Sequence, residues 1–416
     1  MNPVAEMTDD RCVDDLDRLS ELLERIGAKR LLLVTDPIAY RASGAQQRLA
    51  PLWLRYPAAS FSGFEPNPKL DHLVDAIVAL GNRPGGAVDP PDSAAVVAIG
   101  GGTAIDLAKL VAWVMPHIGS LGEGALGKDA LADGGSKRDL LTARLREMVL
   151  GGVRDDSPVA HLPMIAVPTT GGTGSEATQF AVVYVDGVKR SVDSPRLMPQ
   201  GCVLDPALTA GLPPMVTAHT GLDALCQGIE SAWAVKADAR SLEDAEGAVR
   251  IAWGSLEEAV KSPSAGSRRG MMRAAHLAGR AIQRTRTTAA HAISYTFTSE
   301  FGIPHGHAVA LTLGPLLNYN ALVTDGDCCD PRGAEAVRRR IDRIVDWLGC
   351  RDAQEARVRF EGLLDRLGCE RRLSVLGISG GTALERIASR VDPQRLGNNP
   401  RRLSHEAVVG LLESVA

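Results

Sequence analysis

The chain is poor in aromatic residues and has no long uninterrupted hydrophobic run. These features help to exclude some classes of protein. Aromatic side chains make up 4% of its 416 residues. Its longest apolar stretch, residues 94–114, is interrupted by Asp106 and Lys109, so it does not predict a membrane span. Residues 1–16 are acidic and have no apolar core, which argues against a secretory signal. We therefore expect a cytoplasmic protein with no membrane partner.

The chain also has no excess of positive charge. Lys and Arg together number 46 against 50 Asp and Glu, which gives a formal net charge of -4 at pH 7. No basic run is interleaved with aromatic residues, so the sequence predicts no nucleic-acid partner. Hydrophobic residues (45%) and charged residues (23%) occur in the proportions of an ordinary globular protein, and the length suggests two or three domains with ample core.

The cysteine content suits a reducing compartment. Seven cysteines are an odd number in a long chain, and Cys328 and Cys329 are adjacent, an arrangement in which two cysteines rarely pair. We interpret all seven as structural thiols.

Short apolar segments alternate with helical patterns in the first half of the chain. Residues 30–35, 94–99 and 163–167 are predicted to be buried strands, and residues 69–80 and 104–114 are predicted to be helices between them. This alternation is typical of a parallel sheet that helices cover on both faces. The first half is therefore predicted to be a Rossmann-like α/β domain.

The pattern changes after Pro206 and the pair Pro213-Pro214. From there on the apolar spacing predicts amphipathic helices at residues 216–235, 241–260, 268–284, 331–348, 353–367 and 404–415. We expect an α/β domain over residues 1–206 and an all-α domain over residues 207–416.

Two glycine-rich loops follow predicted strands. Gly100-Gly101-Gly102 lies directly between a strand and a helix, where close backbone approach and free N–H groups suit a pyrophosphate; a tight turn explains the triplet equally well. The second loop, residues 168–176, is dense in hydroxyls and glycine. Two such loops after parallel strands suggest a dinucleotide at the carboxyl edge of the sheet. The candidate cofactor-binding residues are Asp36, Gly100, Gly101, Gly102, Thr103, Asp106, Lys109, Thr169, Thr170, Thr173 and Ser175.

Asp36 bears on the choice of nicotinamide cofactor. It ends the first predicted strand, where a carboxylate can accept hydrogen bonds from a ribose diol and would repel a 2′-phosphate. This position favours NAD(H) over NADP(H). The alternative is that Asp36 only begins a turn before Pro37.

Four residues in the second half could converge on a metal ion. Asp223 and Gln227 are four residues apart, so one helical face presents both side chains. His291 lies in a helix-like stretch, and His305 follows the break at residues 302–304. A carboxylate, an amide oxygen and two imidazoles suit a divalent metal with an open position for substrate. Taken singly, each histidine is more often a surface or core residue, and an Asp and a Gln at this spacing are common by chance.

Together, these residues resemble the iron-containing alcohol dehydrogenase family, which has a dehydroquinate synthase-like fold. The resemblance spans residues 30–320 and a short segment near the end. It rests on Gly100–Lys109, Pro168–Glu176, Asp205-Pro206 with Leu212-Pro213, Gly221–Glu230, Pro304-His305-Gly306 and Asn399-Pro400-Arg401.

The resemblance implies that Asp223, His291 and His305 are metal ligands. The fourth family ligand is usually His, but the residue here is Gln227, a weaker and harder ligand that leaves Fe²⁺ and Zn²⁺ both open. Many members also carry a His at the position of Tyr295, which lies four residues after His291 and would face the same site.

The segments TTAAHAISYTFTSEFGIPHGHAVALTLG and RLGNNPRRL further resemble the phosphonoacetaldehyde reductases within this family. The resemblance implies that phosphonoacetaldehyde, a small anionic aldehyde, is reduced to 2-hydroxyethylphosphonate, a primary alcohol, by hydride transfer from NADH with the metal as Lewis acid. Tyr295, His307 or water would supply the proton. Arg286, or Lys189 and Arg190 in a loop between strands, would bind the anionic group.

Three alternatives stay open. The first is the same chemistry on another small aldehyde, alcohol or polyol. The second is a dehydroquinate synthase-like cyclase, which should need more basic residues around its site than this lysine-poor chain offers. The third is a metal-free dinucleotide sensor. The sequence leaves the oligomeric state open, with a homodimer among the alternatives.

Overall fold

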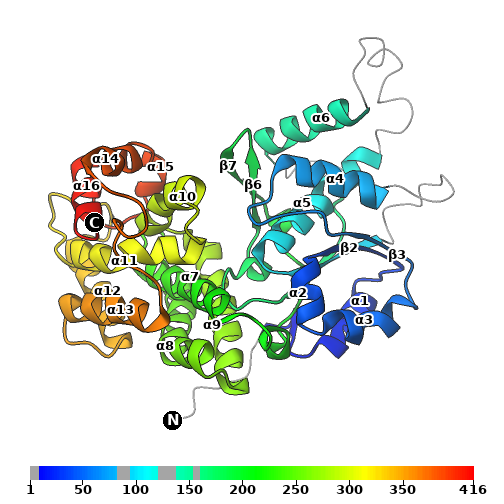
Figure 1. The fold of residues 1–416 in the computed structure, drawn as a ribbon, viewed down its shortest axis with the longest axis horizontal. Coiled ribbons are helices and arrows are strands. Elements are labelled where there is room, and N and C mark those ends of the chain that lie inside the picture. The colour runs from blue at the N-terminus through cyan, green and yellow to red at the C-terminus, as the bar shows by residue number, and fades with distance from the viewer. Residues whose placement is uncertain (1–8, 82–93, 120–136, 153–159) are drawn as a thin grey trace. The chain divides into compact units, whose positions relative to one another are not determined.

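The computed structural model describes residues 9–81, 94–119, 137–152 and 160–416, and the chain divides into two compact units (Figure 1). The α/β unit comprises Met1–Thr170 and Ser175–Gly211. The helical unit comprises Gly171–Gly174 and Leu212–Ala416. The loop Gly171–Gly174 therefore belongs to the helical unit, although it lies in the sequence between the two segments of the α/β unit.

A six-stranded parallel sheet forms the centre of the α/β unit. Its order is β1 (Cys12–Val13), β8 (Gly201–Val203), β5 (Met164–Pro168), β4 (Ala94–Gly100), β2 (Arg30–Thr35) and β3 (Ala58–Phe61). The three strands predicted from the sequence are confirmed within one residue at each end. They are the three adjacent strands in the middle of the sheet.

Alternate residues of these strands enter different apolar clusters. In β2, Leu32 and Val34 pack into one cluster, whereas Leu31 and Leu33 pack into another. Successive side chains of a strand point to opposite faces, so both faces of the sheet are buried, as the continuous apolar runs indicate.

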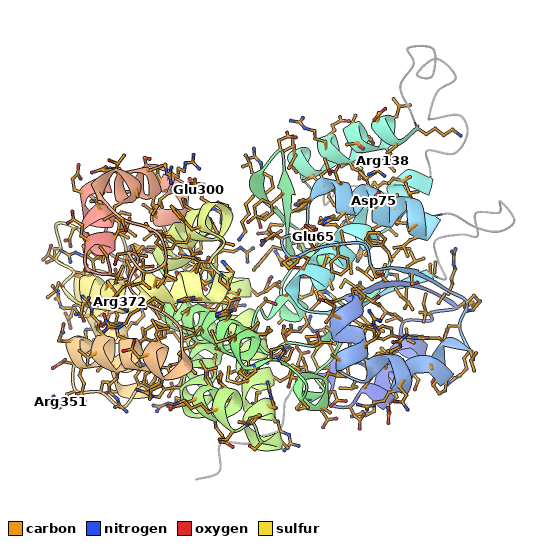
Figure 2. All side chains as sticks on the ribbon, in the orientation of Figure 1. Glu65, Asp75, Arg138, Glu300, Arg351 and Arg372 are labelled. Atoms are coloured by element: carbon orange, nitrogen blue, oxygen red, sulfur yellow. A yellow bond between two sulfur atoms is a disulfide. The ribbon has the colours of Figure 1, made fainter. Side chains whose placement is uncertain are left out.

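Helices and a hairpin complete the α/β unit. The helices are α1 (Leu19–Arg25), α2 (Pro37–Ala42), α3 (Ala45–Trp53), α4 (Leu70–Gly81), α5 (Gly102–Gly119) and α6 (Lys137–Gly151). The antiparallel hairpin consists of β6 (Phe180–Val185) and β7 (Val188–Asp193). The 3-10 helices are η1 (Leu16–Arg18), η3 (Ser175–Ala177), η4 (Pro195–Leu197) and η5 (Pro206–Thr209). An exposed ion pair between Asp75 of α4 and Arg138 of α6, with 2.5 Å between Oδ1 and Nη1, links two of the helices (Figure 2).

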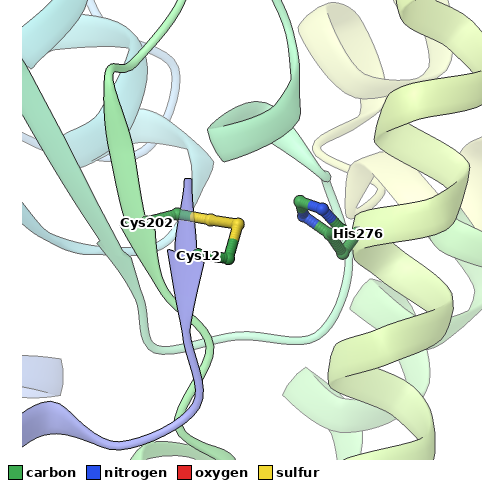
Figure 3. A group of neighbouring side chains, drawn as sticks. All are labelled: Cys12, Cys202 and His276. Atoms are coloured by element: carbon green, nitrogen blue, oxygen red, sulfur yellow. A yellow bond between two sulfur atoms is a disulfide. The ribbon is translucent and has the colours of Figure 1, made fainter. Parts of the chain in front are cut away.

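A disulfide joins Cys12 to Cys202 in this unit (Figure 3). The prediction that all seven cysteines are thiols is therefore wrong for these two. They are 190 residues apart in the sequence, but the parallel register of β1 and β8 sets them opposite each other with 4.6 Å between their Cα atoms. That separation is within the range a disulfide requires. The free thiols are Cys226, Cys328, Cys329, Cys350 and Cys369.

The helical unit contains α7 (Pro214–Trp233), α8 (Ala239–Lys261), α9 (Ala265–Thr285), α10 (Ala289–Phe301), α11 (His305–Ala321), α12 (Ala334–Trp347), α13 (Ala353–Leu367), α14 (Gly381–Ser389), α15 (Pro393–Leu396) and α16 (His405–Glu413). One large apolar cluster forms its core. Glu300 of α10 pairs with Arg386 of α14, with 3.4 Å between Oε2 and Nη2, and with Arg390, which follows that helix (Figure 2). Within the described ranges, no helix is both long and apolar enough to cross a membrane.

Candidate metal and cofactor site

Three of the predicted metal ligands lie together in the helical unit. Asp223 of α7, His291 of α10 and His305 at the start of α11 each offer one ligand atom, and these atoms all lie within 4.8 Å of one another. Oδ1 of Asp223 is 3.3 Å from Nε2 of His291 and 4.0 Å from Nε2 of His305. Two atoms that bind one ion at about 2.1 Å in tetrahedral geometry are about 3.4 Å apart. The cluster is therefore of a size that fits a divalent ion.

Gly306 allows α11 to begin against α7. A Cβ at this position would collide with the carbonyl oxygen of His219 and would lie 2.9 Å from Cβ of Asp223. Only glycine permits that approach without a shift of one of the helices. His305 precedes Gly306, so the same close contact brings its imidazole beside the carboxylate of Asp223.

Gln227 has a buried amide oxygen, Oε1, that no hydrogen bond satisfies among the residues that the structure describes. Its Nε2 donates to the backbone carbonyl of Thr173 at 3.3 Å. A buried amide oxygen without a partner is costly, and a cation would satisfy it. Asp223, Gln227, His291 and His305 thus fit a divalent metal.

Glu230 holds His291 and was not among the residues predicted from the sequence. It lies on the same face of α7 as Asp223 and Gln227, and its Oε2 accepts a hydrogen bond from Nδ1 of His291. Its Oε1 accepts from Thr288 N at 3.0 Å and from Thr288 Oγ1 at 2.7 Å. A carboxylate on the second ring nitrogen fixes the tautomer that leaves Nε2 for a metal. Its spacing of seven residues from Asp223 places it on the same helical face, but this spacing alone does not distinguish Glu230 from a surface acid.

The ligand cluster carries a strong negative field. Burial lowers the pKa of His291, but the charge of Glu230 and the hydrogen bonds to Asp223 and Glu230 outweigh it and raise the pKa to about 9. Without a metal, the imidazolium form satisfies both carboxylates. A divalent cation can replace that proton on Nε2 and keep the same partners.

Tyr295 and His307, the predicted proton suppliers, have different surroundings. The ring of Tyr295 stacks near that of His305, with 6.2 Å between centroids and 12° between planes. Nε2 of His307 donates to the carbonyl of Glu370 at 2.6 Å, and its ring stacks on His219. Burial lowers the pKa of His307, and burial together with His307 lowers that of His219 to about 4. A neutral His307 has its only N–H directed at a carbonyl, whereas the ring of Tyr295 lies beside that of a predicted ligand.

The first glycine loop needs glycine for packing at one position. A Cβ on Gly100 would lie 2.7 Å from Cβ of Ala104 and 3.0 Å from Cβ of Asp36. A Cβ on Gly101 would only reach ordinary contact with Thr170, at 3.5 Å. The tight turn therefore accounts for Gly100. Gly101, Gly102 and Thr103 at the start of α5 stay predicted cofactor contacts.

Asp36 caps a helix. Its Oδ1 accepts from the backbone N–H groups of Ile38 and Ala39, both at 3.0 Å, and it is the N-cap residue of α2. This is the local turn role that the sequence offered as an alternative. It leaves Oδ2 for a ribose, so the NAD(H) role stays a prediction.

Asp106, Lys109 and Ser175 form a polar network under the second loop. Nζ of the fully buried Lys109 donates to Ser175 Oγ at 3.0 Å, Thr178 Oγ1 at 2.9 Å and Phe180 O at 2.8 Å. Asp106 accepts from Ser175 Oγ at 2.6 Å. Protein acceptors thus occupy all three donors of the ammonium group. In this arrangement Lys109 supports the loop, and a direct contact with the cofactor would require one of these bonds to break.

The second glycine loop packs against helices of the helical unit. A Cβ on Gly172 would lie 2.5 Å from Cβ of Thr220 in α7, and one on Gly174 would lie 2.5 Å from Cα of Gly279 in α9. These glycines are needed for close backbone contact, and Thr173 between them orients Gln227. Thr169 Oγ1 is buried and has no hydrogen-bond partner in the described part of the chain, which fits its predicted cofactor contact. Thr170 is part-buried beside Gly101.

The basic residues predicted to bind an anionic substrate belong to two different elements, the C-terminus of α9 and the strand β7. Nη1 of Arg286 donates to the backbone carbonyls of Gln283 at 2.5 Å and Ile282 at 3.4 Å, at the C-terminus of α9. Lys189 and Arg190 lie in strand β7, so the prediction that they occupy a loop is wrong.

Comparison with known proteins gives the family. The model of the iron-containing alcohol dehydrogenases matches residues 13–206, and the C-terminal model of the Fe-containing alcohol dehydrogenase family matches residues 217–416. The chain belongs to the iron-containing alcohol dehydrogenase family. It is therefore an NAD-dependent oxidoreductase of aldehydes and alcohols that uses NAD(H) and a divalent metal ion. This assignment favours the oxidoreductase over the cyclase and the sensor.

Particular relatives narrow the comparison. A phosphonoacetaldehyde reductase from Streptomyces viridochromogenes is 39% identical over 325 residues, which cover 76% of this chain and 74% of that one. A long-chain-alcohol dehydrogenase from Geobacillus thermodenitrificans is 31% identical over 306 residues, covering 73% and 69%. The structure of a sulfoacetaldehyde reductase from Bifidobacterium kashiwanohense in complex with NAD+ has a TM-score of 0.75 and 26% identity, covering 98% of this chain and 96% of that one. A 1,3-propanediol oxidoreductase, with a TM-score of 0.79 and 24% identity over 97% of both chains, shares the fold.

Proposed function

We propose that this enzyme reduces phosphonoacetaldehyde to 2-hydroxyethylphosphonate with NADH. The observation that carries the choice of substrate is the 39% identity to a phosphonoacetaldehyde reductase. A structural relative at 26% identity is named for sulfoacetaldehyde, which also has a tetrahedral anionic group beside an aldehyde. Both comparisons support a short anionic aldehyde as the substrate class.

The chain's own residues would hold the cofactors as follows. Asp223, Gln227, His291 and His305 would bind the divalent ion, and the loops after β4 and β5 would bind the dinucleotide. When bound, the ion supplies a Lewis acid for the carbonyl oxygen, and NADH supplies the hydride. Because the buried carboxylates of Asp223 and Glu230 are hydrogen-bonded to His291, they hold its ring in one orientation before substrate arrives.

Tyr295 is the proposed source of the proton. Nη1 of Arg395 donates to its phenolic oxygen at 2.9 Å. The position of its ring beside that of His305 supports transfer of the hydroxyl proton to the carbonyl oxygen of the substrate. His307, whose N–H is used by Glu370, is the weaker candidate.

A coupled assay of NADH oxidation tests the proposal. The enzyme is loaded with Fe²⁺ or Zn²⁺ and supplied with phosphonoacetaldehyde or with propionaldehyde, a neutral aldehyde of similar length. We expect kcat/KM to be at least about tenfold higher for the phosphonate, because a dianion makes charge-assisted hydrogen bonds that a methyl group does not. Equal efficiency on both aldehydes would contradict the proposed substrate and leave a general aldehyde reductase.

A further inference from the structure

We propose that Arg395 is an anion subsite beside the metal ligands and binds the phosphonate group of the substrate. This inference rests on the proposed function, since it assigns one end of that substrate to a residue. It also differs from the sequence prediction, which named Arg286, Lys189 and Arg190.

Arg395 is one aromatic ring away from a metal ligand. Its guanidinium carbon lies 4.9 Å from the centroid of the Tyr295 ring, and its Nη1 donates to the hydroxyl of that ring at 2.9 Å. The Tyr295 ring also stacks near the imidazole of His305, with 6.2 Å between the centroids. A two-carbon aldehyde with a phosphonate measures roughly 5 Å between its terminal oxygens, from bonds of about 1.5 Å. A substrate of this length suits a carbonyl at the ligand cluster and an anionic group at a nearby guanidinium.

Within the part of the chain that the structure describes, no tight ion pair neutralises Arg395. The carboxylate within ion-pair distance, among the described residues, is that of Asp392, 3.7 Å from Nε, and both side chains are well exposed at 37% and 51%. Other arginines of this unit are bonded more tightly to carboxylates. Arg284 donates to both oxygens of Asp238, at 3.1 and 2.8 Å, and Arg372 donates to both oxygens of Glu370, at 2.9 Å each. Arg395 therefore keeps charge and donors for a ligand that brings its own oxygens.

The guanidinium is also held in place. Its contacts with the Tyr295 ring and hydroxyl restrict a side chain that would otherwise lose rotamer freedom on binding. Its planar fork can donate two hydrogen bonds to a tetrahedral oxyanion, which the point charge of a lysine cannot reproduce. Arg286, by comparison, donates to two backbone carbonyls of its own helix.

The test compares two substrates in three variants. Arg395→Met removes the charge, Arg395→Lys keeps the charge without the fork, and Arg390→Met is the control. Arg390 has a 57% exposed side chain and pairs with Glu300 on the surface. We expect Arg395→Met to lower the ratio of kcat/KM for phosphonoacetaldehyde to kcat/KM for propionaldehyde by about 10- to 100-fold, mainly through KM. Arg395→Lys should be intermediate, and Arg390→Met should leave the ratio unchanged.

A second readout is independent of the proposed substrate. Inorganic phosphate should inhibit propionaldehyde reduction by the unaltered enzyme competitively, and Arg395→Met should weaken this inhibition by about tenfold or more. If the unaltered enzyme shows no preference for the phosphonate aldehyde but phosphate inhibition depends on Arg395, the proposed substrate fails and the subsite stands. If the preference is present and both the ratio and the inhibition are the same in Arg395→Met, the subsite is refuted and the proposed function stands. An equal loss with both aldehydes and unchanged phosphate inhibition would show that Arg395 only supports Tyr295, which also overturns the subsite.

Discussion

Glu230 positions His291, one of the four proposed metal ligands, through a hydrogen bond to its Nδ1. It is fully buried, and every hydrogen bond described for its side chain comes from Thr288 or His291. The helix α7 brings Asp223, Gln227 and Glu230 onto one face because they are spaced by four and three residues. The sequence predicted the four ligands as a set, but Glu230 could not be distinguished from a surface acid without the position of His291.

Replacement of Glu230 should weaken metal binding. Glu230→Gln keeps the size of the side chain but removes the charge that favours the ligand tautomer of His291. We expect the affinity for Zn²⁺ to fall about 10- to 100-fold, as measured by competition with a chelator. Glu246→Gln, which affects a surface acid paired with Arg250 and Arg343, should leave the affinity unchanged. Equal affinity in Glu230→Gln and the unaltered enzyme would show that the contact is not important for the metal.

Asp36 can be tested without loss of the helix cap. Asn is as good an N-cap residue as Asp, so Asp36→Asn should retain the bonds to Ile38 and Ala39 while it removes the charge. We expect the ratio of kcat/KM with NADPH to kcat/KM with NADH to rise by about tenfold, because a 2′-phosphate no longer meets a carboxylate. An unchanged ratio in steady-state assays would reduce Asp36 to a capping residue.

At the scale of elements, the sequence predicted the regular segments and missed those fixed by contacts far along the chain. Strands β2, β4 and β5 are long apolar runs, so their period and propensity identify them. Helix α11 has apolar residues on all sides, so its sequence has no amphipathic pattern that would predict a helix. The break at residues 302–304 was the only indication of where it begins. The strand β7 and the disulfide between β1 and β8 depend on pairing that no local pattern encodes.

The loop Gly171–Gly174 should depend on its glycines for packing. Gly172→Ala would set a Cβ 2.5 Å from Cβ of Thr220, so α7 or the loop must move. We expect the free energy of unfolding to fall by about 1–3 kcal/mol in urea denaturation. Gly254→Ala is the control, because Gly254 lies in α8 with nothing within 4 Å of the added Cβ. That change should be neutral or stabilising, as alanine is in a helix; a Gly172→Ala protein of full stability would contradict the packing role.

Lys109 should make stability depend on pH. Burial lowers its pKa to about 8, against an ordinary value of 10.5. Between these values the unfolded chain holds a proton that the folded chain has released, so the contribution of Lys109 to the free energy of unfolding rises with pH. We expect the free energy of unfolding of the unaltered enzyme to rise by about 2–3 kcal/mol relative to that of Lys109→Met between pH 8 and pH 10, as measured by urea unfolding. Parallel pH profiles of the two proteins would show that folding does not lower the pKa of Lys109.

At the scale of the whole molecule, the chain combines an α/β unit with a helical unit, and each was recognisable from its sequence for a physical reason. A buried parallel sheet requires apolar strands between helices, and an all-helical unit requires repeated amphipathic patterns. The ligand set followed from residue types and a family resemblance. The supporting groups Glu230, Thr173 and Arg395 did not, because their roles depend on which helices and loops pack together.

The central claim is that Asp223, Gln227, His291 and His305 bind one divalent ion. The most direct measurement is anomalous X-ray diffraction from crystals of the enzyme loaded with Zn²⁺ or Fe²⁺. We expect one strong peak about 2.0–2.2 Å from both histidine Nε2 atoms, a carboxylate oxygen of Asp223 and Oε1 of Gln227. A peak elsewhere, or full NADH-dependent activity in a protein without metal, would contradict the claim.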